Sequence, residues 1–132
     1  MYVQLKDDKK IQVFKPREWQ LMKFGRNDTI KCELTSHGIW AAQLHLTVPP
    51  NSGLSYVKMQ YSRDPKGVND TTGTTTHAID PNGPKSLQLT CLWFFGFEQG
   101  RDFGVRVFHN AKVPLKSKCR QFKALSIQEF RG

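Results

Sequence analysis

The sequence has no long hydrophobic run and begins without an apolar leader. No apolar stretch approaches the roughly 20 residues that a membrane-spanning helix needs, so we expect no membrane partner. The first ten residues, Met-Tyr-Val-Gln-Leu-Lys-Asp-Asp-Lys-Lys, lack the apolar core of a secretion signal. We therefore expect the chain to be made and folded in a cytoplasm.

Cysteine and histidine are scarce and are not spaced as metal ligands. The three cysteines are an odd number and form no C-x-x-C pair, which favours free thiols over a disulfide framework. The histidines match neither H-E-x-x-H nor finger spacing. We predict that His45 and His109 are exposed, because we assign both to the polar phases of strands. The residues concerned are Cys32, Cys91, Cys119, His37, His45, His77 and His109.

The sequence also lacks the usual arrangements of catalytic groups. Only 11 acidic residues are present, and no two of them are singled out as a carboxylate pair. No glycine-rich phosphate loop precedes a helix. A cysteine and histidine nucleophile is formally possible, but each cysteine has a plain structural interpretation. We therefore expect no enzyme, no metal site and no cofactor.

Positive charge is abundant and lies at the two ends of the chain. The net charge is +9, made of +4 over residues 1–26, −1 over residues 27–100 and +6 over residues 101–132. If the first and last strands lie side by side, the two ends merge into one basic face. That face is either a solvated surface or a binding site for an acidic partner.

Every-second-residue hydrophobicity dominates the sequence and predicts an all-β protein. Such alternation is typical of half-buried strands, whose successive side chains point to opposite faces. A length of 132 residues suits one domain. Residues 63–76, polar and rich in threonine, are predicted to form an irregular loop. The predicted strands, about eight in number, cover residues 9–14, 19–24, 30–34, 40–48, 57–61, 87–97, 105–108 and 121–127.

The order of these segments resembles the jelly roll of the tumour necrosis factor and complement globular head family. Three pieces carry the resemblance: Gly38 followed by the strand at 39–46, the strand Leu87 to Phe97 followed by Gly100 to Val107, and the closing strand at 122–127. The resemblance covers residues 20–127. More narrowly, the chain resembles small jelly-roll proteins of bacteriophage virions, which decorate the capsid or belong to the tail. The fold class we expect is a jelly-roll β-sandwich of antiparallel strands.

The resemblance implies a homotrimer, and the sequence offers a physical reason for one. Leu92 and Phe94 lie on the second face of their strand, and Ile39 and Ala41 on the second face of theirs, so one sheet has apolar residues on both sides. The predicted trimer interface comprises Ile39, Ala41, Leu92, Phe94, Phe108, Leu125 and Ile127. We divide the chain into an N-terminal arm with the first strand, residues 1–19, which reaches a neighbouring subunit, and a jelly-roll domain, residues 20–132.

The function that this interpretation favours is a trimeric capsid decoration protein of a bacteriophage virion. It would bind the major capsid protein, or tail proteins, through a basic surface. That surface comprises Lys9, Lys10, Lys15, Arg17, Lys116, Lys118 and Arg120. The second hypothesis is a minor tail or tail-tip protein that binds a host-surface glycan through exposed aromatic residues. Its candidates are Trp19, Tyr56 and Tyr61.

The third hypothesis is a β-barrel that binds single-stranded nucleic acid. Basic residues alternate with aromatic ones near both ends, as at Lys23 and Phe24 or Phe122 and Lys123, and such a pattern could follow a backbone and stack bases. The most aromatic strand, Leu87 to Phe97, is predicted to lie in the core, where its rings could not stack on bases. Nucleic acid is therefore the least favoured of these partners.

Overall fold

The computed structural model describes residues 2–27, 29–31, 38–62, 71–95 and 102–126. Within these ranges the chain is all β, and no described segment is a helix long and apolar enough to cross a membrane. The strands are β1 (Tyr2–Asp8), β2 (Gln12–Phe14), β3 (Gln20–Leu21), β4 (Ile30–Lys31), β5 (Gly38–Thr47), β6 (Tyr56–Ser62), β7 (Thr71–Ala78), β8 (Ser86–Phe95), β9 (Asp102–His109), β10 (Leu115–Ser117) and β11 (Arg120–Ser126).

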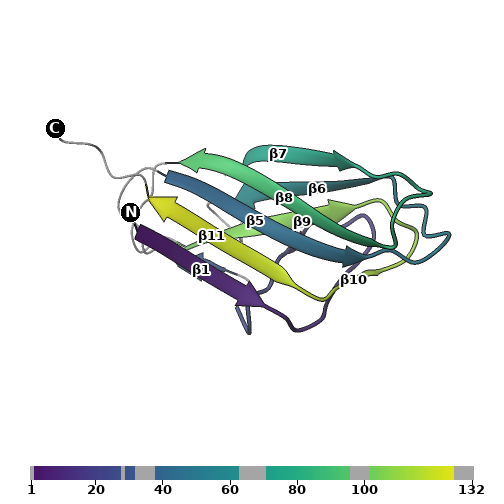
Figure 1. The fold of residues 1–132 in the computed structure, drawn as a ribbon, viewed down its shortest axis with the longest axis horizontal. Helices are drawn as coiled ribbons and strands as arrows, with labels where there is room; N and C mark the ends of the chain where they lie inside the picture. Colours follow the sequence, from purple (N-terminus) through teal and green to yellow (C-terminus); the bar gives the residue numbers. More distant parts are fainter. Residues whose placement is uncertain (1, 28, 32–37, 63–70, 96–101, 127–132) are drawn as a thin grey trace.

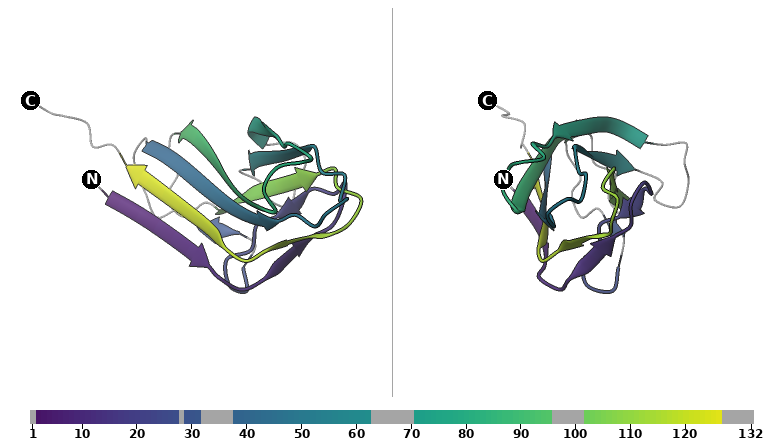
Figure 2. Two further views of the ribbon diagram at one scale, coloured as in Figure 1. Left: turned by 45° about the vertical axis from the view of Figure 1, so that its right-hand side comes forward. Right: turned by 90° about the vertical axis from the view of Figure 1, so that its right-hand side faces the viewer.

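Two antiparallel sheets form a sandwich (Figures 1 and 2). The first sheet has the order β1-β11-β5-β10-β2, with β8 paired along β5. The second has the order β3-β9-β6-β7, with β4 paired to β9. The predicted fold class, an all-β sandwich of antiparallel strands, is confirmed.

The core lies between the sheets and is built from the alternating apolar positions. Along β5 every second side chain is buried, beginning at Gly38 and continuing through Trp40 to Leu46. The centroid of the Trp40 ring lies 4.0 Å from that of Phe103 and 5.5 Å from that of Phe122. These contacts join β5, β9 and β11. Burial of each such side chain contributes roughly 1.5–3 kcal/mol, so this cluster is a main source of stability.

The first and last strands of the chain lie side by side. This is the condition under which we expected the two basic ends of the sequence to form one face. β1 pairs with β11 from Tyr2↔Ser126 to Asp8↔Arg120, and β2 pairs with β10. We call these two pairings together the terminal seam. Residues 2–8 and 12–14, which we assigned to the N-terminal arm, thus belong to the sheet of their own subunit. Whether residues 1–19 also reach a neighbour stays a prediction.

Strand β7 corrects the prediction of an irregular loop across residues 63–76. Thr71–Ala78 form a strand that pairs with β6, and residues 63–70 lie outside the described part of the chain. Threonine is β-branched and suits a strand, but β7 is polar because it is at the margin of its sheet. The ladder shifts register between Gln60 and Tyr61, opposite Gly73, whose φ is +60°. A Cβ at Gly73 would lie 3.0 Å from Cδ1 of Trp93. Both the positive φ and this close approach favour glycine at the position.

Candidate functional site

The terminal seam gathers most of the residues predicted to form a basic surface. Because β1 meets β11 and β2 meets β10, lysines from both ends of the sequence come to one side of the molecule. The predicted residues that are exposed there or beside it are Lys9, Lys10, Lys15, Arg17, Lys116 and Lys118. Their side chains are available to an acidic partner.

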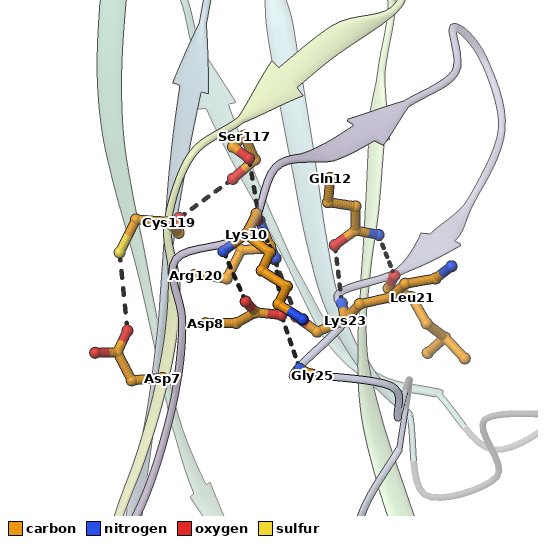
Figure 3. A network of polar contacts seen from close by, with 10 residues as sticks. All are labelled: Asp7, Asp8, Lys10, Gln12, Leu21, Lys23, Gly25, Ser117, Cys119 and Arg120. Atoms are coloured by element: carbon orange, nitrogen blue, oxygen red, sulfur yellow. Dashed lines mark hydrogen bonds and ion pairs between the residues drawn. The ribbon is translucent and has the colours of Figure 1, made fainter.

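Arg120 does not belong to this surface, and its assignment there was wrong. The side chain is 1% exposed, and its Nη2 lies 3.1 Å from Oδ2 of Asp8. It also donates hydrogen bonds to three backbone carbonyls, those of Lys10, Ser117 and Lys23, at 2.8, 3.1 and 3.0 Å (Figure 3). The physical reason is phase, since Arg120 shares the inward side of β11 with Phe122 and Ala124.

Asp8 completes this buried network on the other side of the seam. Its carboxylate accepts hydrogen bonds from the backbone N–H groups of Lys10 and Gly25, at 2.8 and 2.7 Å. Burial alone would raise the pKa of Asp8. The two N–H donors and the Arg120 guanidinium outweigh burial and hold that pKa below its usual value of 3.8. The pair is thus charged and internally satisfied, and its role is to join the ends of the chain.

An open pocket of about 260 Å³ lies over this network. Its wall includes Gln12, whose side chain donates to the carbonyl of Leu21 and accepts from the N–H of Lys23. The polar groups beneath it, Asp8 and Arg120, are engaged with the protein itself. The buried ion pair at its base is therefore not available to a ligand, and the exposed charged groups of the lining are Lys10 and Lys23.

The outer face of the first sheet carries an apolar band. Pairing places Leu5, Lys123, Ala41 and Leu92 in one row across β1, β11, β5 and β8. The large side chains at the two margins are strongly exposed, with Leu5 at 54% and Leu92 at 63%. The next row contains Leu125 and Ile39, both half-buried. We call Leu5, Ile39, Ala41, Leu92 and Leu125 the aliphatic face.

Four of the seven residues predicted for the trimer interface therefore share one face: Ile39, Ala41, Leu92 and Leu125. Phe94 pairs with Ile39 through the backbone, but its side chain is not described. Ile127 lies outside the described residues. Phe108 does not belong with them, because it lies on β9 in the second sheet. Leu5 was missed since no strand was predicted over residues 2–8.

The outer face of the second sheet carries aromatic rings and two cations. The Phe108 ring lies 5.4 Å from the Trp19 ring on one side and 6.3 Å from the Tyr56 ring on the other. Lys58 Nζ lies 5.3 Å from the centroid of the Tyr56 ring, and the guanidinium carbon of Arg106 lies 5.9 Å from that of Trp19. We call these five residues the aromatic face.

The aromatic face contains two of the three aromatic residues predicted to bind a glycan. Trp19 is 39% exposed and Tyr56 is half-buried on the outer side. Tyr61 is only 5% exposed and packs 4.6 Å from the Trp40 ring in the core, so its assignment to a binding surface was wrong. Tyr61 shares the inward phase of β6 with Val57 and Met59, whereas Tyr56 has the opposite phase.

One histidine and one cysteine meet, but in neutral form. His77 Nε2 lies 3.4 Å from Sγ of Cys91. Burial lowers the pKa of His77 and raises that of the Cys91 thiol, and both shifts oppose a thiolate and imidazolium pair. Cys91 and Cys119 are free thiols, and Cys32 lies outside the described residues. Among the described residues no group of three or more ligating side chains could hold a metal ion.

His109 was expected on the surface and is instead fully buried. Its Nε2 lies 2.8 Å from the carbonyl oxygen of Phe14, and its Nδ1 accepts a hydrogen bond from the N–H of Ala111 at 3.1 Å. Burial lowers the pKa of His109, which favours the neutral ring. His109 shares the inward phase of β9 with Val105 and Val107. Its contact with the Phe14 carbonyl links β9 to β2. His45 is half-buried, with Nε2 2.7 Å from Oγ of Ser86.

Comparison with solved structures identifies the fold. The chain matches a protein in the structure of the infectious bursal disease virus Gx strain with a TM-score of 0.56, 10% identity and 95% of this chain covered. It matches the VP2 subviral particle of the same virus with a TM-score of 0.53, 8% identity and 94% covered. It spans 32% and 33% of those two chains.

A carbohydrate-binding module of Cellvibrio mixtus lichenase 5A is a weaker match. Its TM-score is 0.48 at 9% identity, with 88% of this chain and 75% of that chain covered. No protein-family model and no curated protein sequence matches the chain. The protein is thus a jelly-roll-like β-sandwich. The narrower resemblance to the tumour necrosis factor and complement head family stays a prediction.

Proposed function

We propose that this protein is a structural subunit of a bacteriophage virion, assembling as a homotrimer through its aliphatic face and decorating the capsid. The observation that carries the proposal is the cluster of aliphatic residues on the side of the first sheet turned away from the core, with Leu5, Ala41 and Leu92 in the row that also holds Lys123 and with Ile39 and Leu125 in the next row. A sheet with one face in the core and a second apolar face in water exposes surface that sister copies would cover.

The margins of the aliphatic face give the largest gain on assembly. Leu92 and Leu5 are the strongly exposed members, at 63% and 54%. Complete burial of such a side chain contributes roughly 1.5–3 kcal/mol of free energy. Assembly would gain the share of this that corresponds to the exposed fraction of each side chain. A closed trimer uses this surface three times, whereas an isolated subunit leaves it in water.

The exposed lysines beside the terminal seam provide the second surface. They face an acidic partner, for which we propose the exterior of the major capsid protein. The VP2 subviral particle contains a domain of this fold, so the fold is compatible with particle assembly. In this proposal the protein is not an enzyme, needs no cofactor and is located in the virion. A minor tail protein is the alternative.

Sedimentation velocity tests the trimer. We expect the wild-type protein to sediment as a trimer and Leu92→Asp as a monomer, because the new carboxylate would be buried without a partner in the assembly. Val113→Asp is the matched control, since Val113 is also exposed, at 38%, but follows β9 outside the aliphatic face. A stable wild-type monomer would contradict the proposal.

Co-sedimentation with capsids tests the decoration. The particles are assembled from the major capsid protein of the same phage, and we expect the protein to pellet with them at low salt. The double variant Lys116→Gln, Lys118→Gln should weaken binding because it removes two exposed charges from the basic surface. Binding to purified tails but not to capsids would favour the alternative.

A further inference from the structure

The aromatic face has the features of a ligand site, and the proposed assembly does not use it. It comprises residues of β6 and β9 in the second sheet together with Trp19, which directly precedes β3, and it lies on the opposite side of the sandwich from the aliphatic face. The backbone pairing brings these side chains together, since Lys58 is opposite Phe108 and Tyr56 precedes Lys58 by two residues on the same side of β6. A trimer formed through the first sheet would leave these rings open to solvent.

Two cations, Lys58 and Arg106, border the rings. Lys58 Nζ lies over both Tyr56 and Phe108, 5.3 and 5.9 Å from their centroids. The Arg106 guanidinium lies over Trp19, and its buried Nε makes no hydrogen bond among the described residues. Because this Nε is buried, a bound molecule would meet the guanidinium through its terminal Nη groups, which carry the remaining N–H donors.

Neutral polar side chains continue the face beyond the rings. Gln60 is opposite Arg106 in the pairing of β6 with β9, and its Nε2 donates to Oγ1 of Thr74 at 3.0 Å. Thr76, exposed, is opposite Lys58. Amide and hydroxyl groups both donate and accept, which suits a ligand rich in hydroxyls.

We propose that the aromatic face binds an acidic oligosaccharide, one whose sugar rings carry carboxylates. The apolar side of a sugar ring would pack on Trp19 and Phe108. The carboxylate would take the charge-assisted hydrogen bonds of Arg106 and Lys58, and the hydroxyls would meet Gln60 and Thr76. Lys58 would turn from the ring faces toward the carboxylate, exchanging a weak contact for a stronger one.

The balance of charge favours this ligand over single-stranded nucleic acid. A nucleic-acid strand carries a negative charge at every nucleotide, and binding grooves for it follow the backbone with many cations. Here the rings have Lys58 and Arg106 beside them, and the face continues with the neutral Gln60, Thr74 and Thr76. Asp102, an exposed acidic residue of β9, is opposite Lys31 at the far end of the strand. Isolated negative charges on a hydroxyl-rich chain match this pattern better.

The experiment uses a glycan array that presents uronic-acid and sialylated oligosaccharides beside their neutral counterparts, followed by titration of the best pair. A dT oligonucleotide is titrated in parallel. We expect the wild-type protein to bind an acidic glycan about tenfold more tightly than its neutral counterpart, the effect of one or two charge-assisted hydrogen bonds. We expect Trp19→Ala to abolish binding and Arg106→Gln to bring the acidic and neutral glycans within about twofold.

Controls separate this site from loss of fold and from assembly. Lys85→Gln and Ile11→Ala change an exposed cation and an exposed aliphatic residue away from the face and should bind as the wild type. Lys58→Gln serves as a second charge variant if Arg106→Gln unfolds. The monomer variant Leu92→Asp should keep binding, because its change is on the other sheet. The proposal is overturned if no glycan binds, if neutral glycans bind equally well, or if dT binds more tightly than every glycan.

Discussion

Arg120 and Arg106 are the same residue type in two different settings. Arg120 is 1% exposed, pairs with Asp8 and donates to three carbonyls, so its charge is fully engaged inside the terminal seam. Arg106 is half-buried on the outer face of the second sheet, over Trp19, and its Nε makes no hydrogen bond among the described residues. Strand phase decides the difference, since Arg120 lies on the inward side of β11 and Arg106 on the outward side of β9.

The comparison gives a way to separate structure from function in this molecule. Residues of the terminal seam should affect stability strongly. Residues of the aromatic face should affect stability little and ligand binding strongly.

The largest effect is expected for Arg120→Met. It leaves the Asp8 carboxylate buried without its cation, which costs about 3–5 kcal/mol of the free energy of unfolding. Arg106→Met should cost less than about 1 kcal/mol, since it removes a surface cation and ring contact. Urea unfolding followed by tryptophan fluorescence measures both. Equal losses for the two variants would remove the distinction between these arginines.

A smaller effect is expected from acid. Burial lowers the pKa of His109 below 6.5, so the unfolded chain takes up the proton more readily than the folded one. The free energy of unfolding should therefore fall as the pH drops below about 6.5, with a slope of at most about 1.4 kcal/mol per pH unit for this one group. His109→Gln should reduce the slope, and His77→Gln should reduce it less. An unchanged slope in His109→Gln would contradict the assignment.

Asp8 adds a second loss at lower pH. Its pKa is held below 3.8, so its contribution is present in full above that value and is lost as the pH falls through the lowered pKa. The variant Asp8→Asn should lack this acid step, which urea unfolding between pH 4 and pH 2 would measure.

The smallest effect is expected for Lys58→Gln. The half-buried contact of Lys58 with the rings of Tyr56 and Phe108 is worth about 1 kcal/mol. Thermal unfolding at constant pH should therefore show a shift of a few degrees at most. A large loss of stability would mean that the aromatic face is structural.

Alternation in the sequence predicted the fold class and most of the core. The in-phase apolar residues from Trp40 to Leu46 and from Leu89 to Trp93 are buried as expected, whereas Ala41 and Leu92 on the opposite phase face outward. Alternation carries no signal in strands that lack apolar residues or are very short. β7 is threonine-rich and polar at a sheet margin, while Leu115–Ser117 is too short for a pattern to show.

The candidate sites were predicted only in part, for a related reason. Charge was taken as a sign of exposure, which misplaced Arg120 and His109, although both continue the apolar phase of their strands. Phe108 was assigned to the same face as Ile39, but it lies on β9 in the second sheet. A sequence shows the phase within a strand but not which sheet the strand joins, so the aromatic face could be assembled only from the pairing of β3, β6 and β9.

The bulge at Gly73 has a consequence for how the molecule behaves at high concentration. β7 ends the order of the second sheet, so its outer rim carries backbone groups that no described strand satisfies. A straight rim of that kind is a template on which further chains add, as in fibril growth. The extra residue breaks the regular spacing of that rim and twists it. This one glycine therefore makes the rim of β7 a poorer template for a further strand.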